Sequence, residues 1–440
     1  MDTSPAPFAA PSSAPGSSAP SPSPAGLASA LARRALIRAS TAGALGAGAA
    51  LAGGAGTAAY SAPSSRSVTI LQPGQGKVRG AYVRSRPGEV WWGHLPNRTA
   101  EPVAVVRSGA VVTMDTISHE GLLEDQGKDP RQYFETFGVP EKHVLRDAVA
   151  VAARAEHAGP GPHVVTGPIA VRGAEPGDVL KVEVLALPLR VPYGVISNRH
   201  GKGALPGTYP EQFVADPAHA AYVNTGGNIS VFTSVRATSR GLRARLPGDV
   251  PVGFDLAPFL GLMGVARDTD AMVDSVPPTD AGGNLDINDL GVGSTLYLPV
   301  QVPGAMFFAG DPHMAQGDGE VALTAMEGSL RPTLRLTVVK RGSRKAPRQA
   351  FDHPFAETPD FWVPIGLSDP DGPEGGTNAT SLDIAMKEAV QQALAFLVEE
   401  KGMAGPVAYA YLSAATDFEV SQVVDRTTGI HALIRKADFG

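Results

Sequence analysis

Cysteine is absent from the 440-residue chain, which excludes disulfide bonds, thiolate-bound metal sites and amidases with a cysteine nucleophile. Also missing are the Gly-x-Ser-x-Gly turn of α/β-hydrolases, the Walker phosphate loop and the His-Glu-x-x-His zinc helix. The formal net charge is −6, and binding to nucleic acid needs clustered Lys and Arg. The sequence therefore argues against the common motif-bearing hydrolases and against a nucleic-acid partner.

Glycine and proline, by contrast, are abundant. The 51 glycines and 39 prolines make up about a fifth of the chain, against a usual share of roughly 12%. Because both residues interrupt helices, this density argues against a helical bundle or a coiled coil. Hydrophobic residues make up 43% of the chain, which is enough to bury one or two cores.

The N-terminal segment has the composition of an export signal. Residues 1–30 are rich in Pro, Ala and Ser without a periodic apolar face, so we expect them to be disordered. Arg33-Arg34 then precedes an uncharged stretch of small residues over 39–59, a pattern that resembles a twin-arginine signal. We therefore predict a disordered extension and signal over 1–62, with a secreted, periplasmic or cell-surface location. We expect no stable membrane span after processing; an uncleaved membrane anchor is the alternative.

The rest of the chain is patterned as strands and turns. Short β-branched runs bounded by Gly, Pro, Ser or Asp predict strands at 103–106, 110–114, 179–184, 295–301, 305–309 and 334–338. Apolar residues at helical spacing predict one long helix over 382–400, and shorter helices are expected at 131–137 and 141–157. The sequence thus predicts a mainly β fold, sandwich-like or barrel-like. We expect a β-rich body over 67–340 that carries the site and an α+β portion over 341–440 that completes the fold.

Two glycine-rich acidic clusters have the composition of a functional site. The denser one spans Gly310–Glu320, with Glu327 shortly after it, and the second spans 282–289. Asp311 and His313 are two residues apart, so an extended backbone would place them on one face. Imidazole and carboxylates together form a ligand set for Zn²⁺ or a similar ion. The alternative is a pair of turns whose acids only cap backbone N–H groups.

These clusters also carry a family resemblance. Residues 310–320 resemble the Gly-Asp-x-His-x-x-Gln-Gly-Asp-Gly-Glu signature of the acetamidase/formamidase family, and Glu327 matches its next acidic position. Residues 282–286 resemble the family's Gly-Gly-Asn-x-Asp, and 163–178 resemble its Gly-Pro and Gly-Ala-Glu-Pro-Gly-Asp block. The likeness runs from about residue 78 to the end of the chain. It implies a β-rich fold, hydrolysis of small linear amides such as formamide or acetamide, a homo-oligomer and a bound divalent metal ion.

The chemistry of amides leads to the same kind of site. Water attacks a resonance-stabilised amide only if it is deprotonated and the carbonyl is polarised, and a divalent ion supplies both effects. A carboxylate must also carry the proton to the leaving nitrogen. The candidate metal ligands, for zinc in the first instance, are Asp286, His313, His163 and Asp125. The candidate catalytic residues are Glu327 as the base, with Asp318 and Glu320 to orient it.

Other polar residues leave two interpretations open. Asn198, His200 and Gln316 are candidate substrate-binding residues, and the loop over 198–203 either binds an anionic substrate group or lies on the surface. His119-Glu120 either enters the site or forms a surface pair.

Two other functions also fit the sequence. One is an exported, non-catalytic β-sandwich that binds a sugar or a metal, and the other is a lactam or cyclic-imide hydrolase. A binding module needs ligands for an ion but no spare carboxylate placed to move a proton.

Overall fold

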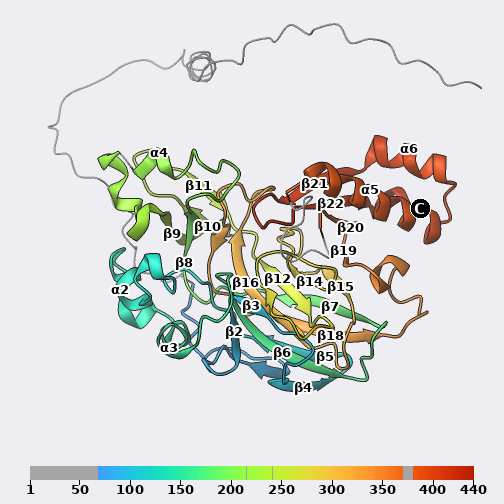
Figure 1. Cartoon of the computed structure of the whole chain (residues 1–440), viewed down its shortest axis with the longest axis horizontal. Coiled ribbons are helices and arrows are strands. Elements are labelled where there is room, and N and C mark those ends of the chain that lie inside the picture. Colours follow the sequence, from blue (N-terminus) through green and yellow to red (C-terminus); the bar gives the residue numbers. More distant parts are fainter. Residues whose placement is uncertain (1–67, 215, 240, 370–379) are drawn as a thin grey trace, which may run out of the picture. The chain divides into compact units, whose positions relative to one another are not determined.

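The computed structural model describes residues 68–214, 216–239, 241–369 and 380–440, whose elements are drawn in Figure 1. The disordered run and export signal predicted over 1–62 lie outside these residues. Strands dominate the described part, so the prediction of a mainly β fold is confirmed. Within the described ranges no helix combines the length and the apolar character needed to cross a membrane.

One large sheet contains nine strands and joins early and late parts of the chain. Its order is β1 (Ala81–Val83), β5 (Ala110–Met114), β18 (Thr333–Val339), β7 (Val179–Ala186), β15 (Thr295–Pro299), β19 (Phe355–Glu357), β20 (Phe361–Leu367), β22 (Gly429–Arg435) and β21 (Asp417–Gln422). Neighbours are antiparallel apart from β1 and β5. The C-terminal strands therefore extend the same sheet to which the body contributes.

A second large sheet contains eleven strands and carries the central part of the site. Its main path is β11 (Gly253–Asp255), β10 (Gly241–Arg245), β9 (Ile229–Thr238), β8 (Tyr193–Asn198), β17 (Met326–Glu327), β16 (Phe307–Ala315), β12 (Phe259–Val265) and β14 (Gly282–Asn284). The strand β6 (Val164–Arg172) pairs with β16 and also with β2 (Val90–Trp92) and β4 (Ala104–Arg107). A small sheet pairs β3 (His94–Leu95) with β13 (Val273–Asp274).

Side chains from both large sheets share one apolar core. Val112, Leu180 and Leu334 of the first sheet lie in the same buried cluster as Ile169 and Phe307 of the second. Burial of apolar surface between two sheets is the arrangement of a β-sandwich. The core therefore holds in place β16, which carries Asp311 at the border of the cavity described below, and β6, which directly follows His163.

Helices are few, and the longest lie near the C-terminus. They are α2 (Pro130–Glu135), α3 (Arg146–Arg154), α4 (Glu211–Val214), α5 (Leu382–Glu399) and α6 (Gly405–Ala415), with short 3₁₀ turns between other elements. The long predicted helix is confirmed as α5, and the Ser381 Oγ accepts a hydrogen bond from the Ile384 N–H at its start.

Two predicted boundaries are corrected. The helix expected over 141–157 is divided into a 3₁₀ turn, η2 (Glu141–His143), and the shorter α3, because Val144 and Leu145 have extended backbones and bury their side chains. The strand expected over 305–309 begins only at Phe307, because Ala305 and Met306 have left-handed φ angles of 60° and 58°. It then continues to Ala315, through the acidic cluster that the sequence presents as a turn.

Candidate active site

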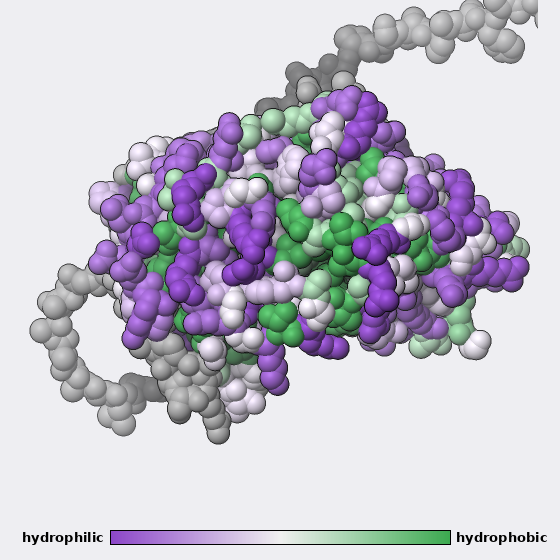
Figure 2. Space-filling view, turned by 90° about the horizontal axis from the view of Figure 1, so that it is seen from below, coloured by the Kyte–Doolittle hydropathy of each residue, from purple (hydrophilic) through white to green (hydrophobic). Residues whose placement is uncertain are grey.

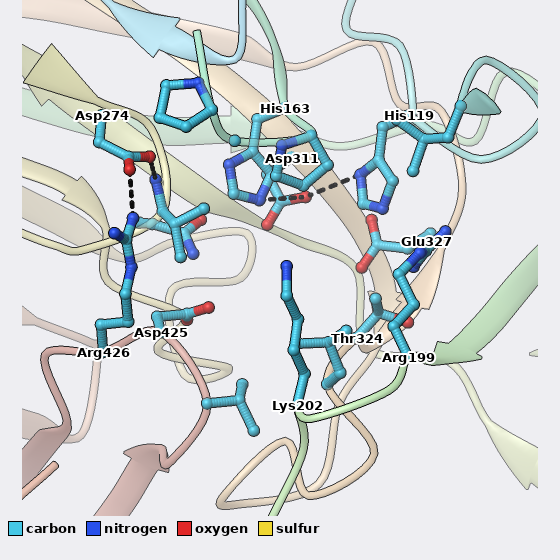
Figure 3. A pocket seen from close by; sticks show the side chains of 18 of the residues that line it. His119, His163, Arg199, Lys202, Asp274, Asp311, Thr324, Glu327, Asp425 and Arg426 are labelled. Carbon is cyan, nitrogen blue, oxygen red and sulfur yellow. Dashed lines mark hydrogen bonds and ion pairs between the residues drawn. The ribbon is translucent and has the colours of Figure 1, made fainter. Parts of the chain in front are cut away.

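An open cavity of about 540 Å³ collects the polar residues of several distant segments. Its walls come from the loop after β5, the start of β6, the loop after β8, the strand β16 and the turn between β21 and β22. Figure 3 shows imidazoles and carboxylates on one side and the cations Arg199, Lys202 and Arg426 around them. The cavity thus unites charged groups that lie up to hundreds of residues apart in the chain.

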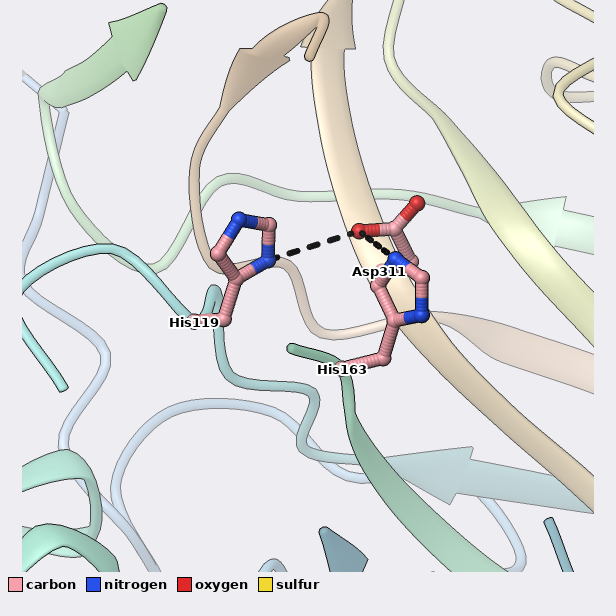
Figure 4. Close-up of side chains that lie close together, drawn as sticks. All are labelled: His119, His163 and Asp311. Atoms are coloured by element: carbon pink, nitrogen blue, oxygen red, sulfur yellow. Dashed lines mark ion pairs between the residues drawn. The ribbon is translucent and has the colours of Figure 1, made fainter. Parts of the chain in front are cut away.

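Three buried side chains direct ligand atoms toward one point (Figure 4). The Asp311 Oδ1 lies 3.8 Å from the His119 Nδ1 and 3.8 Å from the His163 Nε2. These separations are too long for hydrogen bonds. Within the described residues, neither the His119 Nδ1 nor the Asp311 Oδ1 has a hydrogen-bond partner. Buried polar atoms without partners are costly, so this geometry indicates a position for a cation.

The two imidazoles are oriented by their other ring nitrogens. The His163 Nδ1 lies 3.0 Å from the Ser275 carbonyl oxygen, to which it donates, and this leaves the Nε2 lone pair free. The His119 Nε2 lies 3.4 Å from the Glu120 Oε1, a carboxylate that also accepts a hydrogen bond of 2.7 Å from the Ser197 hydroxyl. Burial lowers the pKa of His163 to about 4, which keeps this imidazole neutral. His163 therefore has the tautomer that a metal ligand requires, whereas Glu120, Glu327 and Asp311 raise the pKa of His119 against the effect of burial.

His313 of β16 lies between two carboxylates, those of Asp311 and Glu327. Its Nε2 is 2.8 Å from the Asp311 Oδ2 and 2.9 Å from the Glu327 Oε1, while its Nδ1 is 3.0 Å from the Gln316 Oε1. Although burial alone would lower the pKa of His313, these carboxylates raise it well above its ordinary value. We therefore describe His313 as an imidazolium that fixes the positions of Asp311 and Glu327.

Gly261 of β12 leaves the room that this cluster occupies. A Cβ atom at Gly261 would lie 2.4 Å from the Asp286 Oδ1, 2.6 Å from the Asp311 Oδ2 and 2.7 Å from the His313 Cε1. No side chain larger than hydrogen fits there without moving the polar groups.

Several buried acids in and beside the cavity resist ionisation. Burial, together with the charge of Asp311, raises the pKa of Glu327 to about 7, and burial raises that of Asp425 to about 7 as well. Burial and neighbouring carboxylates raise the pKa values of Asp286 and Glu320 well above their ordinary range. A cluster of this kind is stabilised by any cation that enters it.

Backbone conformation adds a second sign of a functional site. Asp286, Asp311 and Glu320 all have left-handed φ angles, of 50°, 47° and 47°. Such conformations are uncommon outside glycine and concentrate where a structure holds functional groups in place.

Comparison with known proteins identifies a similar family. Residues 265–434 match the model of the Acetamidase/Formamidase family. This region of the chain is similar to that family. The resemblance inferred from the sequence is confirmed, and the matched region contains both acidic clusters.

The curated relatives come from bacteria and yeast. The chain is similar to an acetamidase of Mycolicibacterium smegmatis, with 30% identity over 200 residues that make up 36% of this chain and 49% of that protein. It is also similar to a putative formamidase of Schizosaccharomyces pombe and to a formamidase of Methylophilus methylotrophus, the latter with 28% identity over 60% of this chain and 73% of that one. The matches span about half the length of the first two relatives.

Solved structures share the fold. The acetamidase of Yersinia enterocolitica superposes with a TM-score of 0.61 and 23% identity, over 84% of this chain and 96% of that one. An acetamidase of Bacillus halodurans superposes with a TM-score of 0.59 and 22% identity, over 81% of this chain and 98% of that one. The β-rich family fold is therefore common to all three chains.

The residues that the family signature singled out divide into two buried groups. His163 lies with His119 and Asp311, whereas Asp286, His313 and Glu320 form a neighbouring group in which the Asp286 Oδ1 is 3.8 Å from the His313 Nδ1. Glu327 lines the cavity between them. The assignment of His313 and Asp286 as metal ligands stays a prediction.

The remaining candidates lie around or outside these groups. Asp125 lines the cavity, where it pairs with Arg199. Asp318 is exposed and accepts a hydrogen bond of 2.8 Å from Asn288. Asn198 donates to the Ala322 carbonyl oxygen at 2.7 Å, and His200 forms an exposed pair with Glu211 at 3.0 Å.

Gln316 orients His313. Its Nε2 donates to the carbonyl oxygens of Asp286 and Ser421, at 2.8 and 3.0 Å, so its Oε1 faces the His313 Nδ1. A substrate-binding role for Gln316, Asn198 and His200 stays a prediction, as do metal binding by Asp125 and a catalytic role for Asp318.

Three participants were not assigned from the sequence. His119 was left open between a site and a surface pair, and it is buried in the site. Asp311 was noted only for its spacing from His313. Asp425 lies in the β21–β22 turn, more than a hundred residues from the acidic clusters, and no local pattern marks it.

Proposed function

We propose that the chain hydrolyses small linear amides to ammonia and a carboxylate, with the help of a divalent metal ion. The observation that carries the proposal is the convergence of the buried His119, His163 and Asp311 ligand atoms beside the Glu327 carboxyl group. The family match of residues 265–434 supports the same reaction class.

The donor set fits a divalent ion such as zinc. Two imidazole nitrogens and one carboxylate oxygen are ordinary zinc ligands, and two ligands of a tetrahedral zinc ion lie about 3.4 Å apart. The separations of 3.8 Å around the Asp311 Oδ1 are close to that value. When bound, such an ion supplies Lewis acidity toward the amide carbonyl and toward water.

Glu327 is placed to move the proton. Its Oε1 is held by His313, whereas its Oε2 has no hydrogen-bond partner among the described residues. That free oxygen, at the wall of the cavity, can take a proton from water and return it to the leaving nitrogen, which departs poorly as an amide anion. Glu327 is the spare carboxylate that a pure binding module would not need.

The distances around His313 favour an orienting role for that residue. The His313 Nε2 forms ion pairs of 2.8 and 2.9 Å with two carboxylates, without the angles of a hydrogen bond, and these separations are shorter than the spacing of two metal ligands. The competing ligand set of Asp286, His313 and Glu320 predicts instead that loss of His313 removes the metal.

Metal analysis coupled to ammonia release tests the proposal. The His163→Ala variant should lose both the bound ion and the release of ammonia from formamide and acetamide. The His219→Ala variant, at a half-buried position outside the cavity, should lose neither. Full metal content in His163→Ala would contradict the ligand assignment. No ammonia from any linear amide, with lactams or cyclic imides opened instead, would favour the lactamase alternative, and no turnover at all would favour the binding module.

We further propose that the protein is exported and forms a homo-oligomer. Arg33-Arg34 and the following small residues support export. Figure 2 supports self-association, because hydrophobic side chains gather there within a hydrophilic border. Light scattering of the purified protein should give a mass that is a multiple of the monomer.

A further inference from the structure

The loop after β8 presents two cations to the cavity. Two hydrogen bonds hold this loop against the neighbouring backbone: the Asn198 Nδ2 donates to the Ala322 carbonyl oxygen at 2.7 Å, and the Ala204 N–H donates to the Val321 carbonyl oxygen at 2.9 Å. Gly203 allows the close approach, because it has a φ of 79° and a Cβ there would lie 2.9 Å from the Asn198 Nδ2. The loop is thus held in a defined position in the cavity wall, and it carries Arg199 and Lys202.

The lining cations differ in their partners. The Arg199 Nε lies 3.4 Å from the Asp125 Oδ2, and Arg426 forms a short ion pair with Asp274. Among the residues that the structure describes, Lys202 alone of these three has no carboxylate oxygen within 4.0 Å of its charged group. Figure 3 shows the Lys202 ammonium directed into the middle of the cavity, toward Asp311 and Glu327.

The Lys202 ammonium has no ion-pair partner among the described residues, although Asp274 and Asp425 are near enough to favour its charged form. Burial and the nearby cations Arg199 and Arg426 lower the pKa of Lys202. Asp125 and Asp274 are already paired with those arginines, so a carboxylate of the substrate could serve as the close ion-pair partner that Lys202 has not found in the chain. Charge-assisted hydrogen bonds between an ammonium and a carboxylate are among the stronger polar contacts.

We propose that the preferred substrate is a short amide that also carries a carboxylate, and that Lys202 binds this carboxylate. The inference rests on the proposed amide hydrolysis and narrows its substrate class. With a neutral amide the ammonium stays unpaired, and a site built for a polar partner discriminates against analogues that lack it. Formamide and acetamide are then poorer substrates than an amide such as succinamate.

Matched substrates give a direct test. Succinamate and succinamide have the same length and differ only in carboxylate against carboxamide. For the metal-loaded wild-type protein we expect kcat/KM for succinamate to exceed that for succinamide by about 10- to 100-fold, the value of one charge-assisted hydrogen bond. Lys202→Met should reduce this ratio toward one, mainly through KM, and Lys202→Arg should restore part of it. Lys387→Met, at an exposed position on α5, should keep the wild-type ratio.

Two outcomes overturn the inference. One is a wild-type ratio near one, and the other is a ratio that Lys202→Met leaves unchanged. Calorimetric binding of succinate separates this failure from failure of the proposed function. If no amide releases ammonia, yet succinate binds the wild type and binds Lys202→Met at least tenfold more weakly, the carboxylate site stands and the hydrolase assignment fails. Equal binding to both proteins, or to neither, rejects the carboxylate site.

Discussion

Glu327 has two oxygens in different surroundings. One is fixed by the His313 imidazolium and the other faces the cavity without a partner among the described residues. This division allows the carboxyl group to keep its position while one oxygen gains and loses a proton. His313 and Gln316 act on the reaction through that position.

The Glu327→Gln variant separates proton transfer from metal binding. The amide keeps the size of the side chain but cannot take a proton, and general acid–base help is worth roughly 10² to 10⁴ in rate. We expect normal metal content and a fall in kcat of that size, measured by ammonia release. Glu135→Gln, on the exposed side of α2, is the matched control. Near-normal turnover in Glu327→Gln would show that another group moves the proton.

Asp178 stabilises a turn in a pH-dependent way. Its carboxylate accepts hydrogen bonds from the Glu175 N–H at 2.9 Å, the Arg341 N–H at 3.2 Å and the Lys340 Nζ at 2.6 Å. Although burial opposes the charged form, these donors hold the pKa of Asp178 below its ordinary value. The folded state therefore binds this proton more weakly than the unfolded state does.

Asp178→Asn should lower the free energy of unfolding by about 1–3 kcal/mol at pH 7. Because the folded pKa is lowered, this contribution is complete above the unfolded pKa of Asp and is lost as the pH falls through the folded value. Urea unfolding at pH 7 and under acid conditions measures the difference. If Asp178→Asn lowers the free energy of unfolding equally at pH 7 and in acid, the charge of Asp178 does not contribute to stability.

At the scale of elements, α5 packs unusually close to the sheet. Gly366 of β20 makes this possible, since a Cβ there would lie 2.2 Å from the Ala389 backbone nitrogen. Ala385, Ala389 and Ala393 are all fully buried on the facing side of the helix. Small residues on both elements thus allow the helix to cover β20 and β22 at short range.

Gly366→Ala should destabilise the protein by about 1–3 kcal/mol, because the added methyl group meets backbone that cannot move aside. Gly405→Ala provides the comparison: it lies at the start of α6, has open space around its Cβ, and should be neutral or slightly stabilising. Thermal unfolding of both variants checks the contrast. Equal melting temperatures would contradict the close contact.

Local patterns explain which elements the sequence could reveal. The helix α5 combines a regular apolar rhythm with a capping serine, so its prediction needed no tertiary information. The Gly310-Asp311-Pro312 segment has the composition of a turn, yet it is strand, because β12 pairs with Gly310 and Pro312 and β6 pairs with the residues just before them. Pairing between distant segments is invisible in a local pattern.

The site, like the fold, could be predicted only where local sequence patterns carry the information. The acidic clusters and Glu327 were recognisable because they are close together in the chain. His119 becomes a site residue only because the loop after β5 lies beside β16, and Asp425 only because residues 420–423 pair with Gly319. No sequence spacing connects these residues with the acidic clusters. The sequence therefore left the role of His119 open and gave no sign of Asp425.

At the scale of the whole molecule, the export signal can be tested without knowledge of the substrate. Replacing Arg33 and Arg34 with lysines should leave the full-length precursor inside the cell, because twin-arginine recognition depends on the arginine pair. Immunoblots of cell and exported fractions measure this, with the Arg38→Lys variant as the control. Normal export of the double variant would reject the signal and leave the family assignment unaffected.

The turn between β21 and β22 has a consequence for when the protein can work. Its residues Val424, Asp425 and Arg426 form one wall of the cavity, and a ribosome adds them about 260 residues or more after the two imidazoles. His119 and His163 leave the ribosome much earlier, since elongation proceeds at about 5–20 residues per second. The growing chain therefore holds the imidazoles but not the last wall of the cavity. The complete site therefore forms only after the β21–β22 turn has left the ribosome, long after the two imidazoles.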